Sequence, residues 1–130
     1  MRYLLDTCTL IWFLGDDSSH LSETLLVEIE NEENAVFVSV ASIWEMAVKA
    51  SLGKLELPLG LESIESNLQG NGFEILDIRI AHAAEVYALP LVHRDPFDRL
   101  MISQCRVEKL TAITNDSVWS AEQYDIAVKW

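Results

Sequence analysis

The sequence contains no run of about 18 apolar residues, the length that a membrane-spanning helix needs. Its first residues also lack the basic-then-apolar layout of a secretory signal, because the apolar pair Leu4-Leu5 is followed at once by Asp6. We therefore expect a cytoplasmic protein with no membrane partner.

Cysteine is scarce. Cys8 and Cys105 are the only two, they are far apart in the chain, and they form no CxxC pair. We expect free thiols rather than a disulfide. A thiolate zinc site would need more ligands than two cysteines and three scattered histidines supply.

Basic residues are also few, with 9 Lys and Arg against 21 Asp and Glu and a net charge of −12. Such an excess of negative charge disfavours a nucleic-acid partner. The acids are unevenly spread, however, because residues 16–33 contain seven of them and no Lys or Arg. This segment is most simply the solvated face of a helix, although it could also contact a basic partner. Net charge alone does not decide the substrate.

Apolar residues are plentiful and make up 50% of the 130 residues. A chain of this size and composition forms one hydrophobic core, so we expect residues 1–130 to be a single domain and exclude a disordered chain.

The hydrophobic pattern changes period along the chain, and strands alternate with helices. Short apolar and β-branched segments predict strands at 2–5, 35–38, 73–76 and 110–113, with a possible edge strand at 126–130. Helical spacing predicts helices at 9–14, 21–29, 40–52, 61–69, 80–89, from 96 onward and at 117–121. This order predicts a three-layer α/β/α fold with a mostly parallel central sheet.

Several acids follow the predicted strands. Asp6 comes directly after the first strand, Asp116 lies just past the strand at 110–113, and Glu45 lies in the first turns of the helix after the strand at 35–38. Ligands of open α/β sheets collect at the carboxyl ends of the strands. Asp95 and Asp98 open a helix that runs antiparallel to the strands, so they reach this edge only if the preceding loop returns to it.

Each acid also has a purely structural explanation. Asp6 and Asp116 could cap the helices that follow them. The segment from Ser42 to Glu45 fits a capping box, and Asp95-Pro96 is a typical helix start.

If four carboxylates do converge, each ionised pair about 5 Å apart repels by about 3 kcal/mol at an effective dielectric of about 20. Divalent cations would remove this repulsion, and Mg²⁺ or Mn²⁺ suits a site made only of oxygen ligands.

Four segments, in order, carry a more specific pattern. They are Leu4–Thr7, Ser39–Lys49 with Leu52–Leu55, Leu89–Ile102 and Thr114–Asp116, and Tyr124–Trp130 follows as a closing strand. Together they resemble the motifs of PIN domains, in particular the VapC-like ribonuclease toxins of type II toxin–antitoxin systems. The third segment, which contains His93-Arg-Asp-Pro-Phe-Asp98, is the most specific.

The resemblance implies a metal-dependent endoribonuclease that hydrolyses RNA phosphodiester bonds. By it, Asp6, Glu45, Asp98 and Asp116 are the catalytic acids that hold one or two Mg²⁺ ions, with Mn²⁺ as a possible substitute. It further implies a homodimer and a cognate antitoxin whose tail covers the site.

Other residues of these motifs are expected to assist. Asp95, Thr7 and Thr114 would support the metal ligands, and Lys49 and Arg94 would contact RNA. The alternative for Lys49 is an i,i+4 ion pair with Glu45. For His93 a hydrogen bond within its loop is favoured over a general-acid role.

Two alternatives to a ribonuclease are considered. A haloacid-dehalogenase-like phosphotransferase needs an acid two residues after Asp6, where this chain has Cys8. A catalytically inert PIN-like protein-binding module is the second, and the four retained acids argue against it. Cys8 is itself a departure from the resemblance, because relatives often have His, Ser or Asn there, and it bears on rate and metal preference.

Overall fold

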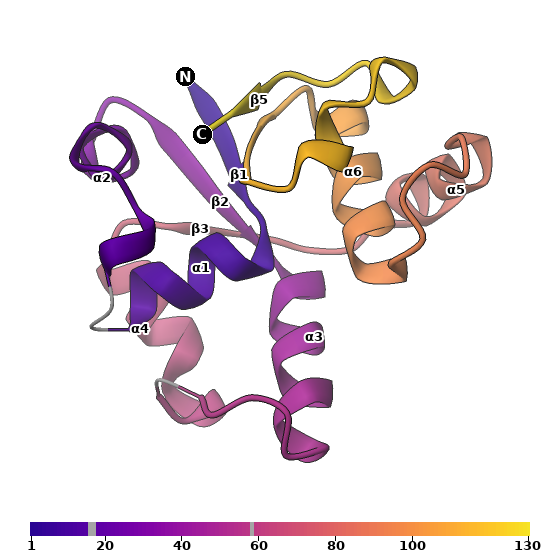
Figure 1. The fold of residues 1–130 in the computed structure, drawn as a ribbon. Helices are drawn as coiled ribbons and strands as arrows, with labels where there is room; N and C mark the ends of the chain where they lie inside the picture. Colours follow the sequence, from indigo (N-terminus) through magenta and orange to yellow (C-terminus); the bar gives the residue numbers. More distant parts are fainter. Residues whose placement is uncertain (16–17, 58) are drawn as a thin grey trace.

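The computed structural model describes residues 1–15, 18–57 and 59–130, and these build a five-stranded sheet in which all neighbouring strands are parallel (Figure 1). The strand order is β3-β2-β1-β4-β5, so β1 lies at the centre. The strands are β1 (Arg2–Leu5), β2 (Ala35–Ser39), β3 (Glu74–Leu76), β4 (Thr111–Ile113) and β5 (Val128–Lys129). The expected edge strand at the C-terminus is β5.

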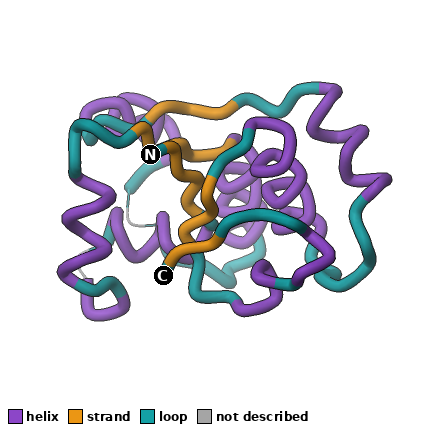
Figure 2. The backbone as a smooth tube through the Cα atoms, turned by 90° about the horizontal axis from the view of Figure 1, so that it is seen from above, coloured by secondary structure: helices purple, strands orange, loops and turns teal. Residues whose placement is uncertain are grey.

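Helices cover both faces of this sheet, as Figures 1 and 2 show from two directions. One layer contains α1 (Thr7–Leu14), α2 (Glu23–Glu30) and α4 (Ile64–Gly70), and the other contains α5 (Ile80–Ala88) and α6 (Pro96–Glu108). Helix α3 (Val40–Ser51) extends from the end of β2 and contacts both α1 and α6. The 3₁₀ turns are η1 (Ser18–His20), η2 (Leu61–Ser63), η3 (Ser117–Ser120) and η4 (Glu122–Tyr124). The prediction of a three-layer α/β/α fold is confirmed.

The sheet has a hydrophobic core on each face because successive side chains of a strand point to opposite sides. In β1, Tyr3 and Leu5 pack into the core under α1, α2 and α4, whereas Leu4 packs into the core under α6. All three side chains are almost completely buried. A central strand buried on both faces is expected in a parallel sheet, which explains why residues 3–5 are apolar without alternation.

Two details of the predicted helices were wrong. Helix α1 begins at Thr7 rather than Thr9, because Asp6 is its N-cap. The capping box from Ser42 to Glu45 does not exist, because α3 begins at Val40 and its N-cap is Ser39. Ser42 instead lies buried inside α3, where its hydroxyl oxygen lies 3.1 Å from Thr7 Oγ1.

The acidic segment is a solvated surface, as expected. Glu23, Glu30, Glu32 and Glu33 are exposed on and after α2, and Glu28 accepts a hydrogen bond from Tyr3 Oη at 2.7 Å. Asp16 and Asp17, also counted in that segment, lie outside the described residues. Within the described ranges, the helices are too short or too polar to cross a bilayer.

Candidate metal centre

Asp6 anchors the site at the carboxyl end of the central strand. Its Oδ1 accepts hydrogen bonds from the backbone N–H and the hydroxyl of Thr9, at 2.9 and 2.6 Å, and its Oδ2 accepts one from Thr114 Oγ1 at 2.5 Å. The side chain is only 5% exposed. One carboxylate therefore caps α1 and also connects β1 to the end of β4.

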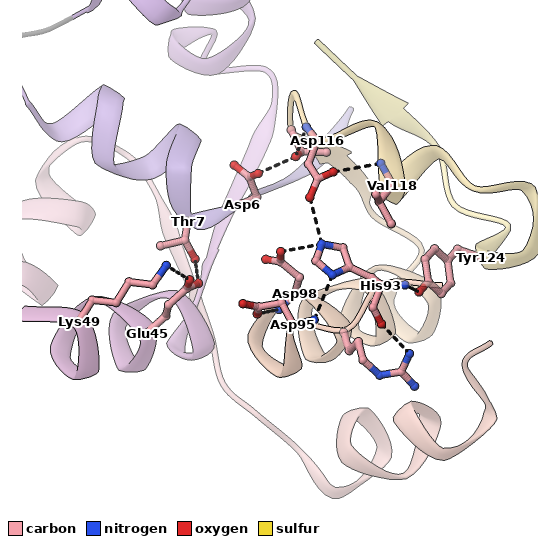
Figure 3. Close-up of polar contacts among 12 residues, drawn as sticks. Asp6, Thr7, Glu45, Lys49, His93, Asp95, Asp98, Asp116, Val118 and Tyr124 are labelled. Atoms are coloured by element: carbon pink, nitrogen blue, oxygen red, sulfur yellow. Dashed lines mark hydrogen bonds and ion pairs between the residues drawn. The ribbon is translucent and has the colours of Figure 1, made fainter. Parts of the chain in front are cut away.

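Asp116 lies just beyond β4 and is tied to Asp6 through Thr114. The backbone N–H of Asp116 donates to Thr114 Oγ1 at 3.1 Å, and the same hydroxyl donates to Asp6. Asp116 Oδ1 accepts from the N–H of Val118 and caps η3, which leaves Oδ2 directed toward the start of α6 (Figure 3). The buried Thr114 hydroxyl thus fixes the relative positions of two predicted ligands.

Asp98 reaches the same place because the loop of residues 89–95, between α5 and α6, returns to the carboxyl edge of the sheet. Asp95 caps α6 by accepting from the N–H of Asp98 at 3.0 Å. Asp98 Oδ2 then lies 2.9 Å from His93 Nε2, and Asp116 Oδ2 lies 2.9 Å from the same nitrogen. The ligand atoms of these three residues all lie within 4.8 Å of one another.

Arg99 holds the 89–95 loop in this course. Its guanidinium donates to four backbone carbonyls, those of Val86, Leu89, Pro90 and His93, at 3.0–3.3 Å. These four contacts are all with backbone carbonyls, and within the described ranges Arg99 forms no ion pair with Asp98 or the other predicted ligands. The loop is held from the other side by Tyr124, whose hydroxyl accepts the N–H of His93 at 2.6 Å.

Glu45 forms the other side of the site (Figure 3). Its Oε1 accepts from Thr7 Oγ1 at 2.6 Å and its Oε2 accepts from Lys49 Nζ at 2.6 Å, and the residue is 4% exposed. The predicted i,i+4 pair of Lys49 with Glu45 is present. Its hydrogen bond with Glu45 raises the pKa of Lys49, which keeps this ammonium charged.

The crowded carboxylates disturb one another electrostatically. Burial raises the pKa of Asp98 to about 7, and the nearby charges of Asp95, Glu45 and Asp6 add to this increase, whereas His93 opposes it. Burial also raises the pKa of Asp6, although its hydrogen bonds with Thr114 and Thr9 oppose the change. Asp6, Glu45, Asp98 and Asp116, hereafter the acidic quartet, therefore lie close enough to affect each other's charge.

The donor chemistry of this group fits a hard divalent cation. Asp98 and Asp116 each direct a carboxylate oxygen toward one point, and Asp6 is fixed beside them. Carboxylate oxygens are the ligands preferred by Mg²⁺ and Mn²⁺. A positive ion at this point would also oppose the burial and the neighbouring negative charges that raise the pKa of Asp98.

Three other predicted or notable residues lie around the quartet. Arg94 is exposed and forms no hydrogen bond or ion pair within the described part of the chain. Cys8 is exposed near the quartet, and both cysteines are free, as expected. Burial raises the pKa of the Cys8 thiol to about 11, and the charges of Asp6 and Glu45 add to this. The position of His93 between two quartet acids was missed by sequence analysis, since spacing does not reveal which way the 89–95 loop folds.

The fold and site together define a parallel α/β/α domain with acids gathered at the carboxyl edge of its central strands. The sequence matches the PIN domain family over residues 3–123, and the chain belongs to this family. The family match thus covers all four acids of the quartet.

Solved structures with a similar fold are toxin–antitoxin complexes. One is VapBC2 from Rickettsia felis bound to a DNA fragment from their promoter, with a TM-score of 0.73, 16% identity, and coverage of 100% of this chain and 99% of that one. A second is DNA-bound VapBC from Salmonella typhimurium, with a TM-score of 0.71, 16% identity, and coverage of 99% and 97%. A third is FitAcB from Neisseria gonorrhoeae, with a TM-score of 0.64, 18% identity, and coverage of 97% and 95%. At these identities the likeness establishes the fold, and it agrees with the family match.

Sequence comparison with curated proteins gives no match.

Proposed function

We propose that this chain is a metal-dependent endoribonuclease that hydrolyses RNA phosphodiester bonds, and that it is the toxin of a toxin–antitoxin pair. We further propose that residues 1–130 act as a single PIN domain. The observation that carries the proposal is the convergence of Asp6, Asp98 and Asp116 at the carboxyl edge of a PIN-family sheet. The burial of Asp6 and Glu45 supports it, because buried carboxylates need a compensating positive charge or donors.

Each acid has a distinct part in the proposed reaction. Asp6, Asp98 and Asp116 would hold the cation, and Glu45 would lie on the side from which water attacks. A bound Mg²⁺ or Mn²⁺ would lower the pKa of a water molecule and neutralise charge on the phosphate. Glu45, oriented by Thr7 and Lys49, would accept or orient the proton of the attacking water. Attack by water in this way leaves a 5′-phosphate and a 3′-hydroxyl.

The supporting residues keep these carboxylates in place. Thr114 donates to Asp6 and accepts from Asp116, Thr7 donates to Glu45, and Asp95 caps the helix that carries Asp98. Ligands fixed by such hydrogen bonds meet a metal ion without the cost of ordering flexible side chains.

RNA would approach along the exposed side of the quartet, where two basic residues are available. The side chain of Lys49 is 46% exposed although it pairs with Glu45, and Arg94 is exposed just before Asp95. We propose that both contact the phosphate backbone.

Two protein partners are proposed. One is a cognate antitoxin that covers the acidic quartet, and the other is a second copy of this chain in a homodimer. Helix α5 and the loop after it expose large apolar side chains, among them Ile80, Tyr87 and Leu91, which a second copy would cover. Replacing Ile80 and Tyr87 with Lys should then shift the sedimentation coefficient from dimer to monomer. Both partners would act in the cytoplasm.

Cleavage of a panel of structured RNAs tests the enzymatic proposal. We expect the wild type to cleave RNA in the presence of Mg²⁺ or Mn²⁺ and EDTA to abolish the cleavage. The variants Asp6→Asn and Asp98→Asn should cleave RNA at least about a hundredfold more slowly than the wild type. Asp77→Asn is the matched control, because Asp77 also follows a strand directly but is exposed and outside the quartet. It should cut as fast as the wild type.

Two results would contradict the assignment. Metal-dependent cutting that survives both quartet substitutions would place the activity in another site or another protein. A wild type that binds Mn²⁺ but cuts no RNA would favour the inert PIN-like binding module. Mn²⁺ binding itself is detected as an increase in the melting temperature at millimolar metal.

A further inference from the structure

His93 occupies the centre of the predicted metal centre. Its Nε2 lies 2.9 Å from Asp98 Oδ2 and 2.9 Å from Asp116 Oδ2, so one ring nitrogen bridges the two carboxylates (Figure 3). A divalent cation held by Asp98 and Asp116 would lie between the same two oxygens. The ring nitrogen and the ion therefore compete for one place.

The other ring nitrogen decides whether His93 can itself be a ligand. Nδ1 lies 3.1 Å from the backbone N of Asp95 and accepts its N–H. A backbone N–H can only donate, so Nδ1 carries no proton and the proton of the neutral ring is on Nε2. In this orientation His93 presents an N–H, not a lone pair, to the two carboxylates. It can donate to them but cannot bind a metal ion.

We propose that the Nε2–H of His93 substitutes for the cation between Asp98 and Asp116 in the metal-free protein, and that the ring must turn away when metal binds. This inference rests on the proposed metal centre. By this inference His93 occupies the place of the cation in the metal-free protein, and it thereby weakens the affinity for the cation.

The backbone of His93 is held by contacts that do not involve its ring. The N–H of His93 is bound to Tyr124 Oη and its carbonyl is bound to Arg99 Nη1 at 3.2 Å. The ring makes three polar contacts. Nδ1 accepts the N–H of Asp95, and the single N–H at Nε2 is shared between the carboxylates of Asp98 and Asp116. A shared N–H cannot be well aligned with both oxygens, so each bond is weaker than a linear one.

Two substitutions test the contacts of the two ring nitrogens separately. His93→Asn keeps an oxygen near the position of Nδ1 that can accept the N–H two residues later, as Asn does in turns, but has no group at the position of Nε2. His93→Gln places an amide N–H near the position of Nε2. The matched control is His82→Asn, because His82 has the same arrangement elsewhere: Nδ1 accepts the N–H of Arg79 and Nε2 lies 2.9 Å from Glu108 Oε1.

The experiment measures Mn²⁺ binding by electron paramagnetic resonance and thermal unfolding with EDTA or saturating Mn²⁺, on the full chain. We expect His93→Asn to bind Mn²⁺ roughly tenfold more tightly than the wild type, since hydrogen bonds to charged groups no longer have to be broken. Its melting temperature should be lower than that of the wild type in EDTA and equal to it in saturating Mn²⁺. His93→Gln should bind Mn²⁺ with an affinity close to that of the wild type.

The other outcomes overturn the proposal in distinguishable ways. Weaker Mn²⁺ binding by His93→Asn would make His93 a ligand. If His93→Asn binds Mn²⁺ with unchanged affinity and its melting temperature falls equally in EDTA and in Mn²⁺, His93 serves only to stabilise its loop. The control His82→Asn is expected to behave in this way. In both cases the metal centre stands and only the present inference fails. If neither the wild type nor any variant binds Mn²⁺, the proposed metal centre fails as well.

Discussion

At the scale of single residues, the aspartates of this site combine helix capping with a place in the candidate metal centre. Asp116 uses Oδ1 to cap η3 and directs Oδ2 toward His93, and Asp6 caps α1 through Oδ1 while Oδ2 accepts from Thr114. A carboxylate has two oxygens with several lone pairs, so capping and metal binding do not exclude one another. The two explanations that the sequence offers for these acids are therefore compatible.

The raised pKa of Asp98 predicts how the stability of the metal-free protein depends on pH. Its pKa is about 7 in the folded state against an ordinary value of 3.8, so between these values the folded state binds more protons than the unfolded state. The free energy of unfolding should therefore fall as the pH rises from 4 to 7, and the penalty should be complete above pH 7.

Asp98→Asn removes this penalty, because the amide has no charge but keeps an oxygen that can accept from His93. In EDTA it should raise the free energy of unfolding by about 1–2 kcal/mol at pH 8 and leave it almost unchanged at pH 4. Urea unfolding at the two pH values measures this. An equal difference between the two proteins at both pH values would contradict the electrostatic cause.

Thr114→Val tests the link between Asp6 and Asp116. The substitution leaves a buried acceptor oxygen of Asp6 and the N–H of Asp116 without their partner, so we expect a loss of about 1–3 kcal/mol in the free energy of unfolding. Mn²⁺ affinity should fall as well. Thr111→Val, at the start of the β4 strand that leads into Thr114, is the control and should stay within about 0.5 kcal/mol of the wild type. Equal effects of the two substitutions would show that the hydroxyl of Thr114 has no special role.

At the scale of elements, the 89–95 loop determines whether α6 contributes to the site. The loop leads into the N-terminus of α6, and Asp98 in the first turn of this helix lies beside His93 and Asp116 at the carboxyl edge of the sheet. Arg99, on α6 itself, donates to the carbonyl of Val86 in the last turn of α5 and to three carbonyls of the loop. These include groups that the end of a helix leaves without partners.

Arg99→Lys keeps the charge, but a single ammonium cannot bond four carbonyls in the geometry of a guanidinium. We expect it to lower the free energy of unfolding by about 2 kcal/mol and to weaken Mn²⁺ binding by loosening the loop that positions Asp98.

Arg106→Lys on the same helix is the control for Arg99→Lys. Its ion pair with Glu85 is partly exposed at 3.0 Å, so the loss should stay below about 1 kcal/mol and Mn²⁺ affinity should not change. Chemical unfolding and Mn²⁺ titration compare the two variants. A larger effect of Arg106→Lys would contradict the assigned role of Arg99.

At the scale of the whole molecule, the charge limits how RNA is held. The net charge is −12, and only Lys49 and Arg94 are proposed to contact RNA next to the quartet. Affinity for RNA would then depend more on the metal centre than on a basic surface.

This charge distribution predicts a weak dependence of RNA binding on salt. For the cleavage-deficient Asp6→Asn, the slope of log affinity against log salt should be no steeper than about −2, because few counterions are released. Fluorescence anisotropy with a single-stranded RNA over a range of KCl concentrations measures the slope. A slope of about −5 would reveal an extended basic surface that the present proposal does not contain.

The sequence by itself determined the fold class and the order of strands and helices along the chain. It also identified Asp6 and Asp116 as acids that follow strands. Hydrophobic period distinguishes strands from helices, and the buried residues 3–5 of β1 are apolar because that strand is covered on both faces. The rule that ligands gather at the carboxyl ends of parallel strands placed Asp6 and Asp116 at one edge. The motif order was sufficient to indicate the PIN family, which the family match established.

The tertiary structure decided what depends on contacts between distant parts of the chain. Residue spacing could not show that Arg99 and Tyr124 hold the 89–95 loop against the sheet, that Asp98 consequently reaches Asp116, or that His93 lies between them. Residue spacing also could not exclude the capping box at Ser42. Helix α3 begins at Val40, so Ser42 lies inside the helix, where its hydroxyl contacts Thr7. Local sequence limits the conformation of each segment, whereas the packing of segments far apart in the chain determines which side chains meet.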